Sequence, residues 1–74
     1  MGISTMERNN IIQAAKNIIE NCEVTATKDY IVIVSTQFQK MMKFFEYVLS
    51  NYTNETVPLI KLKSRHKIVV WVNN

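Results

Sequence analysis

The 74-residue sequence predicts one α+β domain, residues 1–74, with the element order α-β-β-α-β-β. Two amphipathic stretches have the apolar spacing of helices, and four stretches rich in β-branched residues lie between and after them. A chain of this length has room for only one core. The simplest packing of these elements is two helices packed on one face of a four-stranded antiparallel sheet.

The first helix is predicted over residues 5–21. Ser4 and Glu7 have the spacing of a capping box, in which each side chain accepts a hydrogen bond from the other residue's free backbone N–H group. Apolar residues then recur at helical spacing, which indicates an amphipathic helix. They are Ile11, Ile12, Ala15, Ile18, Ile19 and Cys22.

Two strands follow, over residues 23–28 and 30–35. The first alternates polar and small apolar residues, and the second is a β-branched run. Lys28 and Asp29 between them form a plausible tight turn, so the two strands are predicted to pair as a hairpin.

Thr36 and Gln39 repeat the capping-box spacing and predict the start of the second helix. The polar stretch 51–56 ends this helix, and strands 57–63 and 67–72 then form a second hairpin around residues 64–66. Pro58 has no backbone N–H group, so its strand begins there or lies at the edge of the sheet. The apolar stripe predicted for the second helix is Phe38, Met41, Met42, Phe45, Val48, Leu49 and Tyr52.

The inventory of reactive side chains favours a protein that is not an enzyme. One cysteine and one histidine cannot supply the four ligands of a structural zinc without several carboxylates, so no metal or cofactor is expected. Cys22 closes the apolar side of the first helix and is interpreted as a buried thiol. No carboxylate pair has a spacing that calls for acid–base catalysis, and no glycine after Gly2 is available for a phosphate-binding loop.

No stretch approaches the roughly 20 apolar residues that cross a bilayer. Residues 1–10 also lack the basic start and apolar run of a signal peptide. We therefore expect an intracellular, cytoplasmic protein with no membrane partner.

The charge of +3 is concentrated near the C-terminal end, because residues 56–74 carry four cations and no acid. Basic β-hairpins can enter a nucleic-acid groove or contact phosphates, with strong salt dependence. An alternative is that these charges are only solvated and keep an edge strand from pairing with other chains. The candidate nucleic-acid-binding residues are Lys61, Lys63, Arg65, His66 and Lys67.

A sheet covered on one face should alternate apolar and polar residues, but residues 30–34 and 68–72 are apolar on both faces. The extra apolar side chains predict an interface centred on Trp71, with Ile31, Ile33 and Val69. They also predict a homodimer, because a second subunit would add buried surface to a small core. The alternatives are that the two helices cover opposite faces of the sheet, or that the strands twist enough for the helices to cover both sets of apolar side chains.

A second candidate surface lies on the second helix, where Lys40, Lys43, Phe44 and Tyr47 fall outside the predicted apolar stripe. Aromatic residues beside cations can stack on bases or dock a protein. Packing of Phe44 beneath the first helix is the alternative.

Together these features predict a small nucleic-acid-binding or regulatory protein that contacts phosphates through the basic C-terminal hairpin. The alternative function is a protein-binding accessory factor, such as a viral-type inhibitor or adaptor, that uses an apolar sheet face or the second helix.

Overall fold

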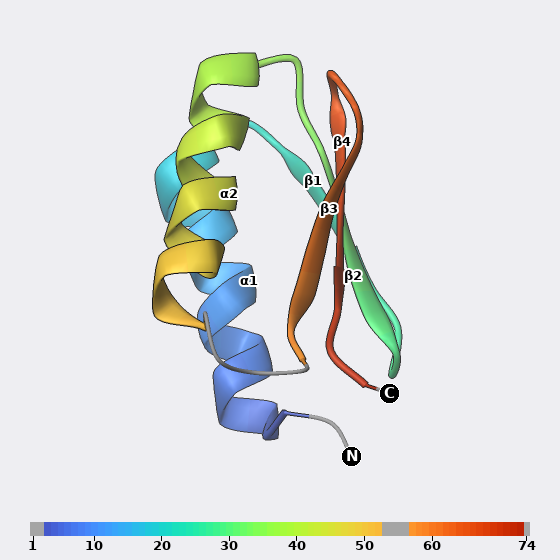
Figure 1. The fold of residues 1–74 in the computed structure, drawn as a ribbon. Coiled ribbons are helices and arrows are strands. Elements are labelled where there is room, and N and C mark those ends of the chain that lie inside the picture. Colours follow the sequence, from blue (N-terminus) through green and yellow to red (C-terminus); the bar gives the residue numbers. More distant parts are fainter. Residues whose placement is uncertain (1–2, 53–56, 74) are drawn as a thin grey trace.

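The computed structural model describes residues 3–52 and 57–73, and it has the predicted order of elements (Figure 1). The predicted fold class is confirmed. Residues 53–56, which belong to the polar stretch predicted to end the second helix, lie outside the described residues. The elements are α1 (Thr5–Ile19), β1 (Glu23–Ala26), β2 (Tyr30–Val34), α2 (Phe38–Asn51), β3 (Leu59–Ser64) and β4 (Lys67–Trp71).

The four strands form one antiparallel sheet with the order β1-β2-β4-β3. Strand β4 is therefore central, and β3, which follows Pro58, lies at an edge. The register places Trp71 of β4 between Tyr30 of β2 and Leu59 of β3. The pairing of β2 with β4 joins the two hairpins and brings residues far apart in the sequence into one row.

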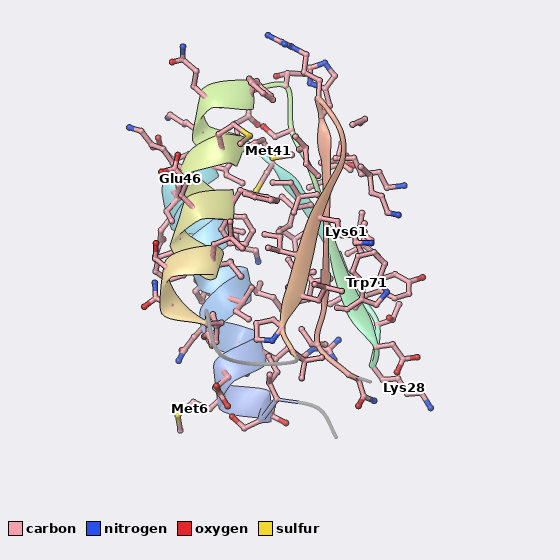
Figure 2. All side chains as sticks on the ribbon, in the orientation of Figure 1. Met6, Lys28, Met41, Glu46, Lys61 and Trp71 are labelled. Carbon is pink, nitrogen blue, oxygen red and sulfur yellow. The ribbon has the colours of Figure 1, made fainter. Side chains whose placement is uncertain are left out.

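Both helices lie on the same face of the sheet, so the core fills the space between the two layers (Figure 1). Figure 2 shows Met41 of α2 between the helix and the sheet, where its side chain is fully buried. The alternative of helices on opposite faces is therefore wrong. The side chains with no exposed surface are Ile11, Ala15, Ile19, Ile31, Ile33, Met41, Phe44, Ile68 and Val70.

The capping box at the start of α1 is confirmed. The backbone N–H of Glu7 donates to Ser4 Oγ at 3.1 Å, and the backbone N–H of Ser4 donates to Glu7 Oε1 at 3.4 Å. The helix ends at Ile19, two residues earlier than predicted, because Glu20 has a positive φ of 67° that does not continue a right-handed helix.

The capping box predicted at the start of α2 is wrong. The cap residue is Gln37, whose side chain makes no capping hydrogen bond. The side chain that bonds to the backbone at the start of α2 is that of Ser35. Its buried hydroxyl donates to the carbonyl of Asn21 at 2.7 Å and accepts from the backbone N–H of Gln37 at 3.1 Å. This one hydroxyl ties the end of α1 to the segment that leads into α2.

We expect Ser35→Ala to lower the free energy of unfolding by about 1–3 kcal/mol, because it leaves two partly buried backbone groups, the carbonyl of Asn21 and the N–H of Gln37, without their partner. Thr36→Ala is the matched control. Thr36 is exposed, so its loss should change the free energy by less than about 0.5 kcal/mol. Urea unfolding followed by circular dichroism measures both, and equal effects would contradict the role assigned to Ser35.

The apolar stripe of α2 is rotated relative to the prediction. Its buried residues are Met41, Phe44 and Val48. Phe45, which was predicted to face the core, is only half-buried, and Leu49 is 48% exposed. The face that packs on α1 and the sheet is thus centred on Phe44.

Candidate functional site

The face of the sheet that points away from the helices is called the open face here. Lys61 and Trp71 both extend from it, on the side opposite α1 and α2 (Figure 2). Because side chains alternate along a strand, the pairing register assigns the other members. The open face consists of Glu23, Thr25, Tyr30, Val32, Val34, Leu59, Lys61, Lys63, Lys67, Val69 and Trp71.

A row of large apolar side chains crosses the open face. Tyr30, Trp71 and Leu59 are direct partners across three adjacent strands. Tyr30 is 38% exposed and Leu59 is 49% exposed, while Trp71 is partly exposed. Two aromatic rings therefore lie side by side at the surface of the sheet.

Three lysines lie on the same face. Lys61 is opposite Val69, Lys67 is opposite Val34, and the Lys63 ammonium is 5.3 Å from the centre of a Trp71 ring. Lys63 lies where the register of β3 against β4 shifts between Leu62 and Ser64. All three lysines are exposed. The acidic residue of the open face is Glu23, which lies on β1 at the opposite edge of the sheet from β3.

Val69 is only 6% exposed although it is on the open face. The helices cover the other face, so side chains of the open face itself must cover Val69. Trp71, with Lys63 over its ring, is next to Val69 on the same side of β4. The open face therefore exposes less apolar surface than the sequence suggested, and the exposed remainder includes Tyr30, Val34 and Leu59.

The structure separates the five predicted nucleic-acid-binding residues into two groups. Lys61, Lys63 and Lys67 lie together on the open face. Arg65 and His66 form the turn between β3 and β4, and their contacts are with the segment that precedes and begins α2. The Arg65 guanidinium is 4.4 Å from the centre of the Phe38 ring, and His66 Nδ1 is 3.1 Å from the carbonyl oxygen of Ser35.

The predicted interface of Trp71, Ile31, Ile33 and Val69 does not form one surface. Ile31 and Ile33 have no exposed surface, because they point into the core beneath the helices. Trp71 and Val69 are on the open face. The placement of the two isoleucines at an interface was wrong, since the helices already cover that face.

The second predicted surface, on α2, is not formed as predicted. Phe44 is fully buried in the core, as the alternative proposed, and Tyr47 is half-buried against it. The ammonium of Lys40 donates a hydrogen bond to the carboxylate of Glu20 and forms an ion pair with it. This contact lowers the pKa of the Glu20 carboxyl below its ordinary value. Lys43 is exposed, without an exposed aromatic partner among these residues.

Two further titratable side chains, Cys22 and Tyr52, are partly buried against the core. Cys22 is half-buried, and burial raises the pKa of its thiol, which keeps it in its less reactive protonated form. Burial also raises the pKa of Tyr52. Within residues 3–52 and 57–73, no three His, Cys, Asp or Glu side chains come close enough to hold a metal ion. Neither helix in this part of the chain has the length and apolar character needed to cross a membrane.

The fold and the open face thus define an α+β domain with a basic and aromatic sheet surface. Comparison of the chain with protein-family models, with curated proteins and with solved structures gave no match.

Sequence reasoning missed Tyr30 and Leu59 as members of the candidate site. The alternation of β2 indicates that Tyr30, Val32 and Val34 share a face. It does not indicate that this face carries Trp71, because Tyr30 and Trp71 meet only through the pairing of β2 with β4.

Proposed function

We propose that this protein is a non-enzymatic nucleic-acid-binding protein that places its open face against a phosphate backbone. The observation that carries the proposal is the position of Lys61, Lys63 and Lys67, which two paired strands bring to the same face as two aromatic rings. Lysine ammonium groups bind phosphates as point charges, so these contacts give affinity without reading a sequence.

The contact surface proposed here is smaller than the one predicted from the sequence, which also included the turn residues Arg65 and His66. Arg65 and His66 are exposed but contact Phe38 and Ser35, in the segment that precedes and begins α2, whereas the three lysines lie together on the open face. The side of the β3–β4 hairpin, rather than its turn, is therefore the surface that would contact phosphates.

The dependence of binding on salt tests the proposal. Three phosphate contacts predict that the logarithm of the association constant falls with the logarithm of salt concentration with a slope of about −2 to −3. Between about 50 and 200 mM salt, affinity should therefore fall roughly 20- to 40-fold. Fluorescence anisotropy of a labelled mixed-sequence oligonucleotide measures this slope. An affinity that does not change with salt would refute phosphate contacts as its source.

A protein-binding accessory role, including self-association as a homodimer, is the second candidate. Its support is the exposure of Leu59, Tyr30 and Val34 on the same face. A partner seated there would compete with nucleic acid for Trp71. Light scattering at low and high salt separates the candidates. A mass that rises with oligonucleotide only at low salt supports nucleic-acid binding, whereas a dimer that ignores oligonucleotide supports the second candidate.

A further inference from the structure

We infer that the open face binds single-stranded nucleic acid, with bases stacked on Trp71 and Tyr30 and the adjoining phosphates on Lys61, Lys63 and Lys67. The inference rests on the proposed function and narrows its ligand from nucleic acid in general to single strands.

The width of the sheet argues against a duplex. Neighbouring strands lie about 4.8 Å apart, so the backbones of four strands span roughly 14 Å before side chains are added. The major groove of B-DNA is about 12 Å wide and admits a helix or a two-stranded ribbon. Trp71 is on the central strand β4, with β2 on one side and β3 on the other. It therefore does not reach base edges inside an undeformed groove, whereas the unstacked bases of a single strand can lie across the sheet.

The two aromatic rings are placed to receive bases. Tyr30 and Trp71 are direct cross-strand partners, and such partners have Cβ atoms about 4.5–5.5 Å apart. Tyr30 is 38% exposed and Trp71 is partly exposed, so both rings present surface to solvent. Stacking on such rings tolerates any base, because every base has a π-face.

Lys63 connects the stacking surface to the phosphate contacts. Its ammonium is 5.3 Å from the centre of a Trp71 ring, within the range of a cation–π contact. A base that stacks on that side of the ring displaces the ammonium, and the flexible lysine stem allows it to move to a neighbouring phosphate. Lys63 thus contacts the Trp71 ring in the free protein and a phosphate in the complex.

Trp71 is the only tryptophan, so its intrinsic fluorescence reports on this site alone. The wild-type chain is titrated with RNA and DNA single strands of one mixed sequence and with the blunt duplex of the same sequence. We expect single strands to quench Trp71 emission and to bind at least about tenfold more tightly than the duplex at equal salt, as base stacking predicts. Unequal affinities for the RNA and DNA strands show whether the 2′-hydroxyl contributes.

Variants then test the rings, with labelled oligonucleotides as the probe. Trp71→Leu should lower single-strand affinity between about 5- and 100-fold, and Trp71→Phe should retain most of it. Duplex affinity should change less than about twofold in both variants, since the duplex does not stack on Trp71. Tyr30→Leu should act in the same direction as Trp71→Leu. Tyr47→Leu is the matched control, because Tyr47 is a half-buried tyrosine on α2 and should leave affinity unchanged.

Two results would overturn the inference. If the duplex binds as tightly as the single strands, and Trp71→Leu and Tyr30→Leu keep wild-type affinity, stacking is refuted while lysine-dependent binding still stands. If neither single strand nor duplex binds at low salt, the inference and the proposed function fail together. Circular dichroism and the urea midpoint of each variant identify any loss of affinity that comes from unfolding.

Discussion

The double variant Lys61→Glu/Lys67→Glu should bind nucleic acid on the order of 100-fold more weakly than the wild type at about 50 mM salt. Both lysines are exposed on the open face, on the paired strands β3 and β4. Charge reversal removes two lysine–phosphate pairs and places two carboxylates where phosphates would lie. The salt slope should also become shallower by about 2, because each lysine that binds a phosphate contributes about 1 to it. Anisotropy at several salt concentrations measures both quantities.

The matched control is Lys16→Glu/Lys43→Glu. These lysines are also exposed but lie on α1 and α2, on the opposite side of the molecule from the open face. The two double variants have the same net charge, so a difference between them reports the position of the charges. We expect the control to bind only a few-fold more weakly, through reduced long-range attraction. Equal reductions in the two variants would show that net charge, rather than the open face, determines binding.

Phe44→Ala should lower the free energy of unfolding by about 3–5 kcal/mol. Phe44 is the largest of the fully buried side chains, and it fills the space between α2, α1 and the sheet. A domain of this length has a total stability of about 4–11 kcal/mol, so the substitution removes a large part of it. Urea unfolding followed by circular dichroism should show a much lower midpoint, or a chain that is already partly unfolded in water.

Phe45→Ala provides the comparison, because it makes the same chemical change one position along the same helix. Phe45 is half-buried, so the expected decrease is only about 1–2 kcal/mol. The sequence pattern predicts the reverse order, with Phe45 facing the core. A larger decrease for Phe45→Ala than for Phe44→Ala would show that α2 is rotated away from the orientation described above.

The order and type of the elements could be predicted because helical and strand periodicities differ strongly in this chain. The rotation of α2 about its own axis could not be predicted from the sequence. Its apolar residues occur in adjacent pairs, Met41 with Met42, Phe44 with Phe45 and Val48 with Leu49, so two neighbouring stripes fit almost equally well. Packing against α1 and the sheet decides between the stripes, and that information is not local to the helix.

The candidate site was predicted in part for a related reason. The period of two along a strand places Lys61 and Lys63 on one face, and both lie on the open face. It could not show which face the helices cover, because β2 and β4 are apolar on both faces. Ile31 and Ile33 were therefore grouped with Trp71, whereas the register of β2 against β4 places Tyr30 beside it.

The division of charge between the two hairpins makes the β3 edge of the sheet more positive than the β1 edge. The β3–β4 hairpin carries Lys61, Lys63, Arg65 and Lys67 with no acid, while the β1–β2 hairpin carries Glu23 and Asp29 against Lys28. The edge strands of these hairpins, β3 and β1, are at opposite sides of the sheet. The electric field of an anionic partner acts on this difference in charge before the two molecules touch. An anionic surface would therefore meet the β3 edge first, and fewer collisions would occur in the wrong orientation.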